Sequence, residues 1–147
     1  MAGLTSLATL AGVWRLTRLI THAGGAENLF RGTASFRRSG PRLIEDEEGW
    51  LSLGDDRAPL LATRRCIWTQ EPGRLECAFG DMRPFHTVPL GVAQPETTFL
   101  CPPDRYEVAY DFSRLPLWRA VWQVEGPKKS YRMESEYRLD GASMQPG

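Results

Sequence analysis

The chain has 147 residues, of which 41% are hydrophobic and 24% charged, a composition typical of one globular domain with its own core. Lysine plus arginine and aspartate plus glutamate both number 18, so the formal net charge is zero. This balance excludes the chain-wide basic surface of many nucleic-acid-binding proteins, and the ordinary apolar and charged shares argue against global disorder.

Residues 1–12 are predicted to form a short helix or a leader. Thr5–Ala11 can make one or two helical turns, with Thr5 or Ser6 as the cap and Gly12 as the stop. The segment before Glu27 has arginines and hydroxyl residues but no acid, as in organelle transit peptides. It has no uninterrupted apolar run with a small-residue cleavage site. We therefore predict a cytoplasmic protein, with a mitochondrial or other organellar location as the alternative.

After Gly12 the hydrophobic period becomes two, which indicates strands. In Val13–Ile20, Trp14 and Leu16 share a face with Arg18, so a strand with an inward-pointing charge is predicted. An acidic run, Glu45–Glu48 before Gly49, predicts a hairpin tip. The further predicted strands, separated by Gly-, Pro- and Asp-containing turns, are Gly32–Arg38, Leu43–Leu53, Leu60–Gln70, Leu75–Phe79, Pro84–Leu90, Tyr106–Phe112, Trp118–Glu125 and Tyr131–Arg138.

The predicted fold class is all-β: an antiparallel up-and-down barrel of eight to nine strands with a short N-terminal helix. No second helical pattern occurs, which argues against βαβ units, and no long crossover loop occurs, which argues against a Greek-key sandwich. The barrel is expected to span residues 13–140 as one domain, with a frayed tail at 141–147.

Six motifs in order along the chain resemble a widespread family of small domains of unknown function. They are Gly12-x-Trp14 with Arg18, Phe30-x-Gly32-x-Ala34-x-Phe36, Arg65-x-x-Trp68, Asp81-x-Arg83-x-Phe85-His86, Cys101-x-x-Asp104-x-Tyr106 and Trp122-x-Val124-x-Gly126-Pro127-x-Lys129. The resemblance implies a lipocalin-like (calycin-type) barrel. Met82 and Phe99 depart from it, because the family usually has glycine and histidine at these positions, and the second departure argues against a two-histidine site.

The densest polar cluster is Asp81, Arg83 and His86. His86 could act as an acid or base, with Asp81, Arg83 and Tyr106 in support. The alternative is a turn aspartate, a surface arginine and a hydrogen-bonded core histidine.

A second set of residues predicts a ligand cavity. A barrel of about eight strands has room for packed side chains or for one small ligand, and both alternatives stay open. Cys101 could be a nucleophilic thiol near His86, or an inert packed cysteine. Lys129, in a hairpin turn, could attract an anionic group at the barrel mouth. The predicted inward-facing ligand-binding residues are Trp14, Arg18, Trp68, Tyr110, Trp122 and Tyr137, with Cys101 and Lys129 beside them.

No metal or other cofactor is predicted. His22 and His86 are the only histidines, and Cys66, Cys77 and Cys101 lack the spacing of a zinc or redox motif. No run of about 18 apolar residues occurs, so no membrane-spanning helix is predicted. The expected partner is a small molecule, with neither nucleic acid nor a membrane, and the oligomeric state is left open.

Three functions are consistent with these residues. The first is a barrel that holds an amphipathic or aromatic organic ligand, with Arg18 or Arg83 at its polar end. The second is a cofactor-free enzyme of the cyclase or isomerase type that uses His86. The third is a filled barrel with a structural or interaction role. The sequence leaves open whether any reaction is catalysed.

Overall fold

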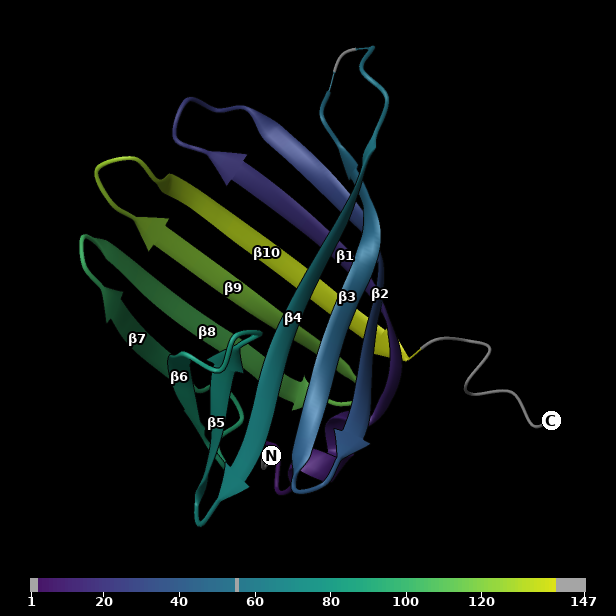
Figure 1. Ribbon diagram of the computed structural model, residues 1–147, viewed down its shortest axis with the longest axis vertical. Coiled ribbons are helices and arrows are strands. Elements are labelled where there is room, and N and C mark those ends of the chain that lie inside the picture. Colours follow the sequence, from purple (N-terminus) through teal and green to yellow (C-terminus); the bar gives the residue numbers. More distant parts are fainter. Residues whose placement is uncertain (1–2, 55, 140–147) are drawn as a thin grey trace, which may run out of the picture.

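The computed structural model describes residues 3–54 and 56–139, which form one curled antiparallel sheet (Figure 1). A short 3-10 turn, η1 (Leu7–Leu10), precedes ten strands. The strands are β1 (Gly12–His22), β2 (Glu27–Ser39), β3 (Arg42–Ser52), β4 (Leu60–Glu71), β5 (Arg74–Phe79), β6 (Pro84–Pro89), β7 (Glu96–Cys101), β8 (Asp104–Arg114), β9 (Leu117–Glu125) and β10 (Ser130–Leu139).

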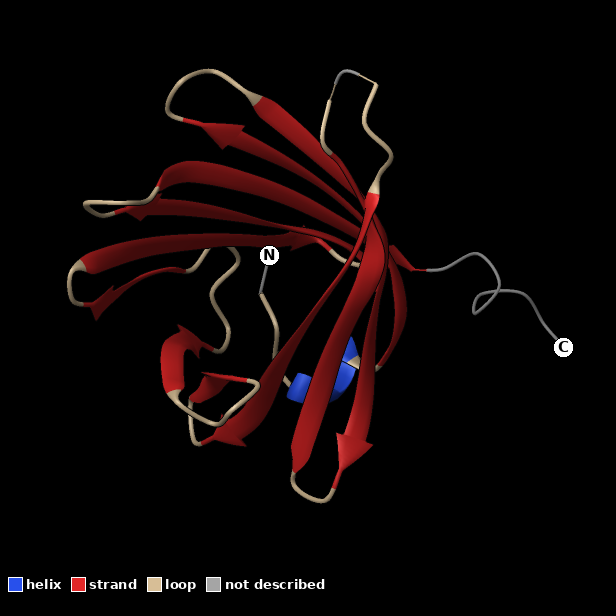
Figure 2. Cartoon of the chain, turned by 45° about the horizontal axis from the view of Figure 1, so that its top comes forward, coloured by secondary structure: helices blue, strands red, loops and turns tan. Residues whose placement is uncertain are grey.

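The sheet curls until its first and last strands meet. Its order is β6-β5-β4-β3-β2-β1-β10-β9-β8-β7, so nearly every strand pairs with its chain neighbours and β1 pairs with β10. The two edge strands, β6 and β7, lie next to each other without a hydrogen-bonded ladder among the described residues. The result is a nearly closed up-and-down barrel (Figure 2), which confirms the predicted fold class.

The strand count differs from the prediction because one strand was overlooked. β7 (Glu96–Cys101) lies between Pro95 and the pair Pro102-Pro103, and this flanking made the segment look like a loop. Its threonines and Phe99 nevertheless pair with β8 over six positions.

The predicted hairpin tip at Glu45–Glu48 is wrong. These residues lie in the middle of β3, which runs unbroken from Arg42 to Ser52. Glu45 and Glu47 alternate with half-buried or exposed neighbours and point into the barrel, where each is at most 3% exposed. A run of acidic residues usually marks a turn. Here, however, the side chains of the strand alternate between its two faces, and this period of two places Glu45 and Glu47 on the inner face with Leu43.

Gly49 is a strand residue and not a turn residue. It lies directly opposite Gly32 of β2, and a Cβ on Gly32 would approach the Glu48 carbonyl oxygen to 2.0 Å. The two backbones can approach this closely only because both positions lack side chains.

The N-terminal segment closes one end of the barrel. The predicted helix is a single 3-10 turn, whose N-cap Ser6 accepts a hydrogen bond from the Ala8 amide. Leu4, Leu7 and Leu10 are buried beneath the sheet, and the Leu10 carbonyl accepts from Trp14 Nε1 at 2.8 Å. The predicted tail at 141–147 lies outside the described residues. Among those that are described, no helix has the length and apolar character needed to cross a membrane.

Aromatic side chains next to the N-terminal segment, here called the N-terminal plug, fill the closed half of the barrel. The Trp118 ring stacks on Tyr137 at 3.7 Å and meets Trp14 edge-on at 5.8 Å. Trp14 and Trp118 are at most 2% exposed. The closed end is therefore a packed core.

Candidate functional site

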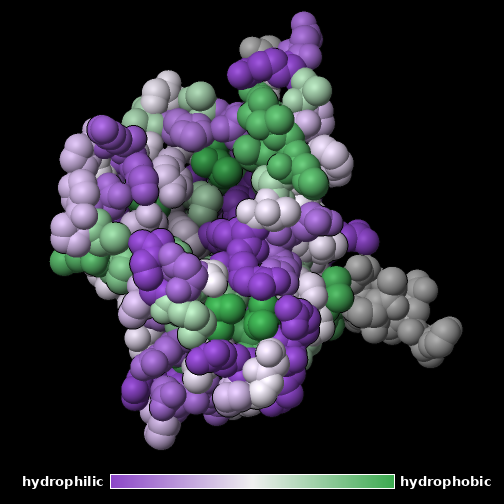
Figure 3. Space-filling model, in the orientation of Figure 1, coloured by the Kyte–Doolittle hydropathy of each residue, from purple (hydrophilic) through white to green (hydrophobic). Residues whose placement is uncertain are grey.

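A cavity of about 280 Å³ lies inside the barrel. Its walls come from the halves of the strands nearest to the loops 23–26, 53–59 and 126–129, which together form the barrel mouth. The space-filling view shows a hollow in this region, with apolar side chains beside it (Figure 3). The apolar and aromatic lining residues are Ile20, Phe30, Leu51, Ala62, Phe79, Tyr106, Trp122, Tyr131 and Met133.

Three charged residues form the floor of this cavity: Arg18, Glu47 and Arg64, here called the charged floor. Arg18 donates two hydrogen bonds to the Glu47 carboxylate, at 2.9 and 3.1 Å. Its Nε donates to the Ser135 hydroxyl at 2.7 Å, and Nη2 also reaches the Tyr137 hydroxyl. Arg18 is therefore a satisfied, buried guanidinium with 6% exposure.

Arg64 is less completely paired. It lies directly opposite Glu47 in the β3–β4 ladder and donates from Nη2 to Glu47 Oε2 at 2.9 Å. Its guanidinium lies over the Trp122 ring, with 4.4 Å from Cζ to the ring centre. The side chain is 29% exposed although it lies inside the barrel, because it borders the cavity. Arg64 is the cation that a molecule in the cavity would meet.

The charges of this floor do not cancel. Burial alone would raise the pKa of Glu47, but Arg64 and Arg18 outweigh it and hold that pKa well below its usual range. Burial raises the pKa of Glu45 well above its usual range, and the Glu47 charge raises it further. The pKa values of the two glutamates are therefore shifted in opposite directions: Glu47 is held in its charged form, and Glu45 is pushed toward its neutral form. In the charged floor itself, two guanidiniums face the one carboxylate of Glu47, which leaves one net positive charge.

His86 lies deeper, behind the charged floor. Its Nε2 is 2.8 Å from the Tyr110 hydroxyl, and its ring packs edge-on against Trp68 at 5.9 Å. The Trp68 indole in turn donates to Glu45 Oε1 at 2.9 Å. Burial lowers the pKa of His86 to about 3, with the Arg64 charge as the second cause. The imidazole is therefore neutral at ordinary pH.

Two thiols lie next to this cluster. Cys66 borders the cavity, and Cys77 lies behind it on β5; both are 3% exposed. The two thiols share a hydrogen bond that lowers the pKa of Cys66, while burial, followed by this bond, raises the pKa of Cys77.

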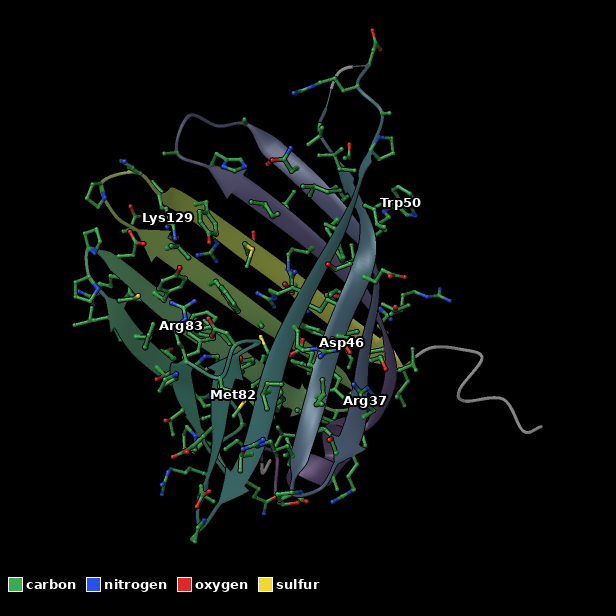
Figure 4. All side chains as sticks on the ribbon, in the orientation of Figure 1. Arg37, Asp46, Trp50, Met82, Arg83 and Lys129 are labelled. Carbon is green, nitrogen blue, oxygen red and sulfur yellow. The ribbon has the colours of Figure 1, made fainter. Side chains whose placement is uncertain are left out.

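Lys129 and Tyr106 lie at the mouth. Lys129 Nζ is 3.2 Å from Asp104 Oδ2 and 3.4 Å from the Tyr106 hydroxyl. Figure 4 shows Lys129 at the β9–β10 end of the barrel and Trp50 pointing outward from β3. Trp50, Leu60 and Leu61 are more than half exposed on the hairpin of β3 and β4.

The structure separates the residues that the sequence grouped around His86. Asp81 and Arg83 form an exposed ion pair of 2.7 Å in the turn between β5 and β6 (Figure 4). His86 is buried, because a register shift between Cys77 and Ala78 lets Phe85 and His86 both turn inward. Tyr106 lines the cavity instead.

The predicted ligand-binding residues divide into three groups. Arg18 and Trp122 line the cavity, and Lys129 lies at its mouth. Trp68, Tyr110 and Tyr137 lie in the interior behind the floor. Trp14 packs on the N-terminal plug, and Cys101, at the end of β7, does not border the cavity.

Arg64 and Glu47 are the functional residues that sequence reasoning missed. The signal was present: in β4, Ala62, Arg64 and Cys66 alternate on the face that carries Trp68. The same reasoning that placed Arg18 inside applies to Arg64. Glu47 was missed because the acidic run was interpreted as a turn. Within residues 3–54 and 56–139, no three His, Cys, Asp or Glu side chains gather as a metal ion would need.

Comparisons with known proteins agree with this architecture. The model of a family of unknown function, DUF6314, matches residues 10–139. No curated protein matches the sequence. Among solved structures, the fold is similar to that of the S-type phycobiliprotein lyase CPES from Guillardia theta, with a TM-score of 0.66 and 9% identity. The likeness covers 90% of this chain and 89% of that one. At this identity it shows the fold alone, and it confirms the lipocalin-like barrel that the family resemblance implied.

Proposed function

Because the chain belongs to DUF6314, a family of unknown function, its function has to be inferred from the site, and we propose that the barrel binds a small amphipathic carboxylate. The apolar body of the ligand occupies the cavity, and its carboxylate meets Arg64 at the charged floor. One observation carries this proposal. An apolar cavity of about 280 Å³ ends in two guanidiniums that face one carboxylate, that of Glu47.

Charge and geometry both favour an anionic head group. An uncompensated buried charge is costly, so an anion that neutralises it gains more here than it would in water. Arg18 already uses its donors on Glu47, Ser135 and Tyr137, whereas Arg64 retains exposed surface toward the cavity. Arg64, and not Arg18, is therefore the residue that recognises the head group.

The size and walls of the cavity define the rest of the ligand. Its volume lies near the lower end of the range for small-molecule sites, which suits a short acyl or monocyclic acid. The walls are apolar and aromatic, so they stabilise the ligand body by burying it.

An enzyme that uses His86 has weaker support. His86 does not border the cavity, and at ordinary pH its imidazole is neutral and bonded to Tyr110. Asp81 and Arg83, its expected helpers, lie outside the barrel. The likeness to a phycobiliprotein lyase extends only to the fold.

The proposal is tested with octanoate, and with 1-octanol as the neutral probe of equal chain length. Titration calorimetry is expected to show binding of octanoate that is at least tenfold tighter than that of 1-octanol. Fluorescence of the tryptophans should change, because Trp122 borders the cavity.

Arg64→Gln should weaken octanoate binding roughly 10- to 100-fold, because this is the typical contribution of a charge-assisted hydrogen bond to affinity. Arg83→Gln is the matched control and should bind as the unmodified protein does, because Arg83 is exposed and pairs with Asp81. Equal affinities for octanoate and 1-octanol, or an Arg64→Gln variant with unchanged affinity, would overturn the proposal.

A further inference from the structure

A second, smaller space lies behind the charged floor. Its volume is about 10 Å³, enough for one water-sized atom. Arg64, Cys66 and Trp122 line both this inner void and the outer cavity, so they form the partition between the two. The remaining lining residues are Glu45, Trp68, Cys77, His86, Tyr110, Trp118 and Tyr137.

Three buried polar atoms lack a hydrogen-bond partner within the described part of the chain, and all three belong to residues that line this void. They are Arg64 Nε, His86 Nδ1 and Trp118 Nε1. His86 and Trp118 are 7% and 2% exposed, so bulk water does not satisfy them. A buried polar group without a hydrogen-bond partner costs free energy, so three such groups around one void favour the binding of a ligand atom there.

The chemistry of these atoms indicates that the ligand atom is a hydrogen-bond acceptor. Arginine Nε and tryptophan Nε1 can only donate. The Tyr110 hydroxyl has His86 Nε2 as its one partner among the described residues, and we assign its O–H as the donor to Nε2, which places the ring proton on Nδ1. With this assignment all three orphan atoms are donors, and the residues that carry them all line the same small void.

A carboxylate oxygen suits this space better than water does. Water and a carboxylate oxygen both accept hydrogen bonds from these donors, but only the carboxylate also neutralises the positive charge beside the void. Glu45 also borders the void, and burial, which raises its pKa, makes its carboxyl resist ionisation beside an anion.

We propose that the inner void is a head-group subsite, where one oxygen of a carboxylate ligand accepts hydrogen bonds from Arg64, His86 and Trp118. The inference rests on the proposed function and deepens it. The ligand body stays in the outer cavity, and the head group passes the partition of Arg64, Cys66 and Trp122. Specificity for a carboxylate over an alcohol or amide then comes from the three donors together with the net positive charge of the charged floor.

The first test changes one donor. Trp118→Phe keeps an aromatic ring against Tyr137 and removes the indole N–H together with some ring volume, and should weaken octanoate binding roughly tenfold without changing 1-octanol binding. Trp14→Phe is the matched control, because the Trp14 indole already donates to Leu10 and does not border the void. It should leave the octanoate affinity unchanged.

The second test needs no variant. In nitrogen-15 histidine spectra of the unmodified protein, octanoate should shift the Nδ1–H signal of His86, while His22, near the mouth and bonded to Asn28, serves as the internal reference. If octanoate binds through Arg64 while His86 does not shift and Trp118→Phe binds normally, the subsite is wrong and the proposed function stands. If octanoate does not bind the unmodified protein, both fail.

Discussion

Glu47→Gln is expected to lower the free energy of unfolding by about 3–5 kcal/mol, the cost of removing one partner from a buried ion pair. The carboxylate receives hydrogen bonds from both Arg18 and Arg64 and is 2% exposed. Without its charge, two guanidiniums remain enclosed with no ionised partner in the floor. Urea denaturation at pH 7 measures the difference.

Glu45→Gln is the matched control, because Glu45 is two residues away on the same face of β3 and equally buried. A carboxyl that burial pushes toward its neutral form, and that accepts a hydrogen bond from Trp68, is imitated closely by an amide. We expect a change within about 1 kcal/mol, toward greater stability, since a raised pKa in the fold opposes folding at pH 7 and an amide does not titrate. Equal destabilisation by the two substitutions would contradict the opposite pKa shifts of the two glutamates.

Acid is expected to destabilise the protein from about pH 6.5 downward because of His86. The pKa of His86 is about 3 in the folded protein, below the value of about 6.5 for an unfolded chain. The unfolded state therefore binds the proton first, so stability is complete above about pH 6.5 and is lost as the pH falls toward 3. Between pH 6.5 and 4 this one residue accounts for about 3 kcal/mol, at 1.36 kcal/mol per pH unit.

The measurement is the pH slope of the unfolding free energy for the unmodified protein and for His86→Gln. The slope between pH 6.5 and 4 should flatten in His86→Gln, whatever its absolute stability. His22→Gln alters an exposed imidazole and should keep the original slope. A His86→Gln variant with an unchanged slope would show that the imidazole is not held neutral in the fold.

Much of the fold could be predicted from the sequence, because a barrel strand with one buried face has a period of two. Val13–Ile20 and Tyr131–Arg138 alternate clearly, and both lie in the paired strands β1 and β10. β7 could not be predicted in the same way, since its residues are half-exposed on alternate positions and prolines flank it. Edge strands bury less side-chain surface than central strands, so their alternation of apolar and polar residues is weaker.

The site was harder to predict than the fold. Inward Arg18 followed from its place between Leu16 and Ile20, but its partners come from β3 and β10, far away in the sequence. Arg64 and Glu47 were recognisable only once those strands were in register, which makes them direct cross-strand neighbours. Strict alternation places Arg83 and His86 on opposite faces, but it does not predict the register shift that turns Phe85 inward beside His86.

The most direct test of the central claim is a crystal structure of the protein grown with saturating octanoate. We expect the carboxylate of octanoate to lie within hydrogen-bond distance of Arg64, and its alkyl chain to lie between the aromatic walls that include Phe30 and Trp122. A barrel whose side chains fill the cavity, or an octanoate whose carboxylate points outward to Lys129, would contradict it.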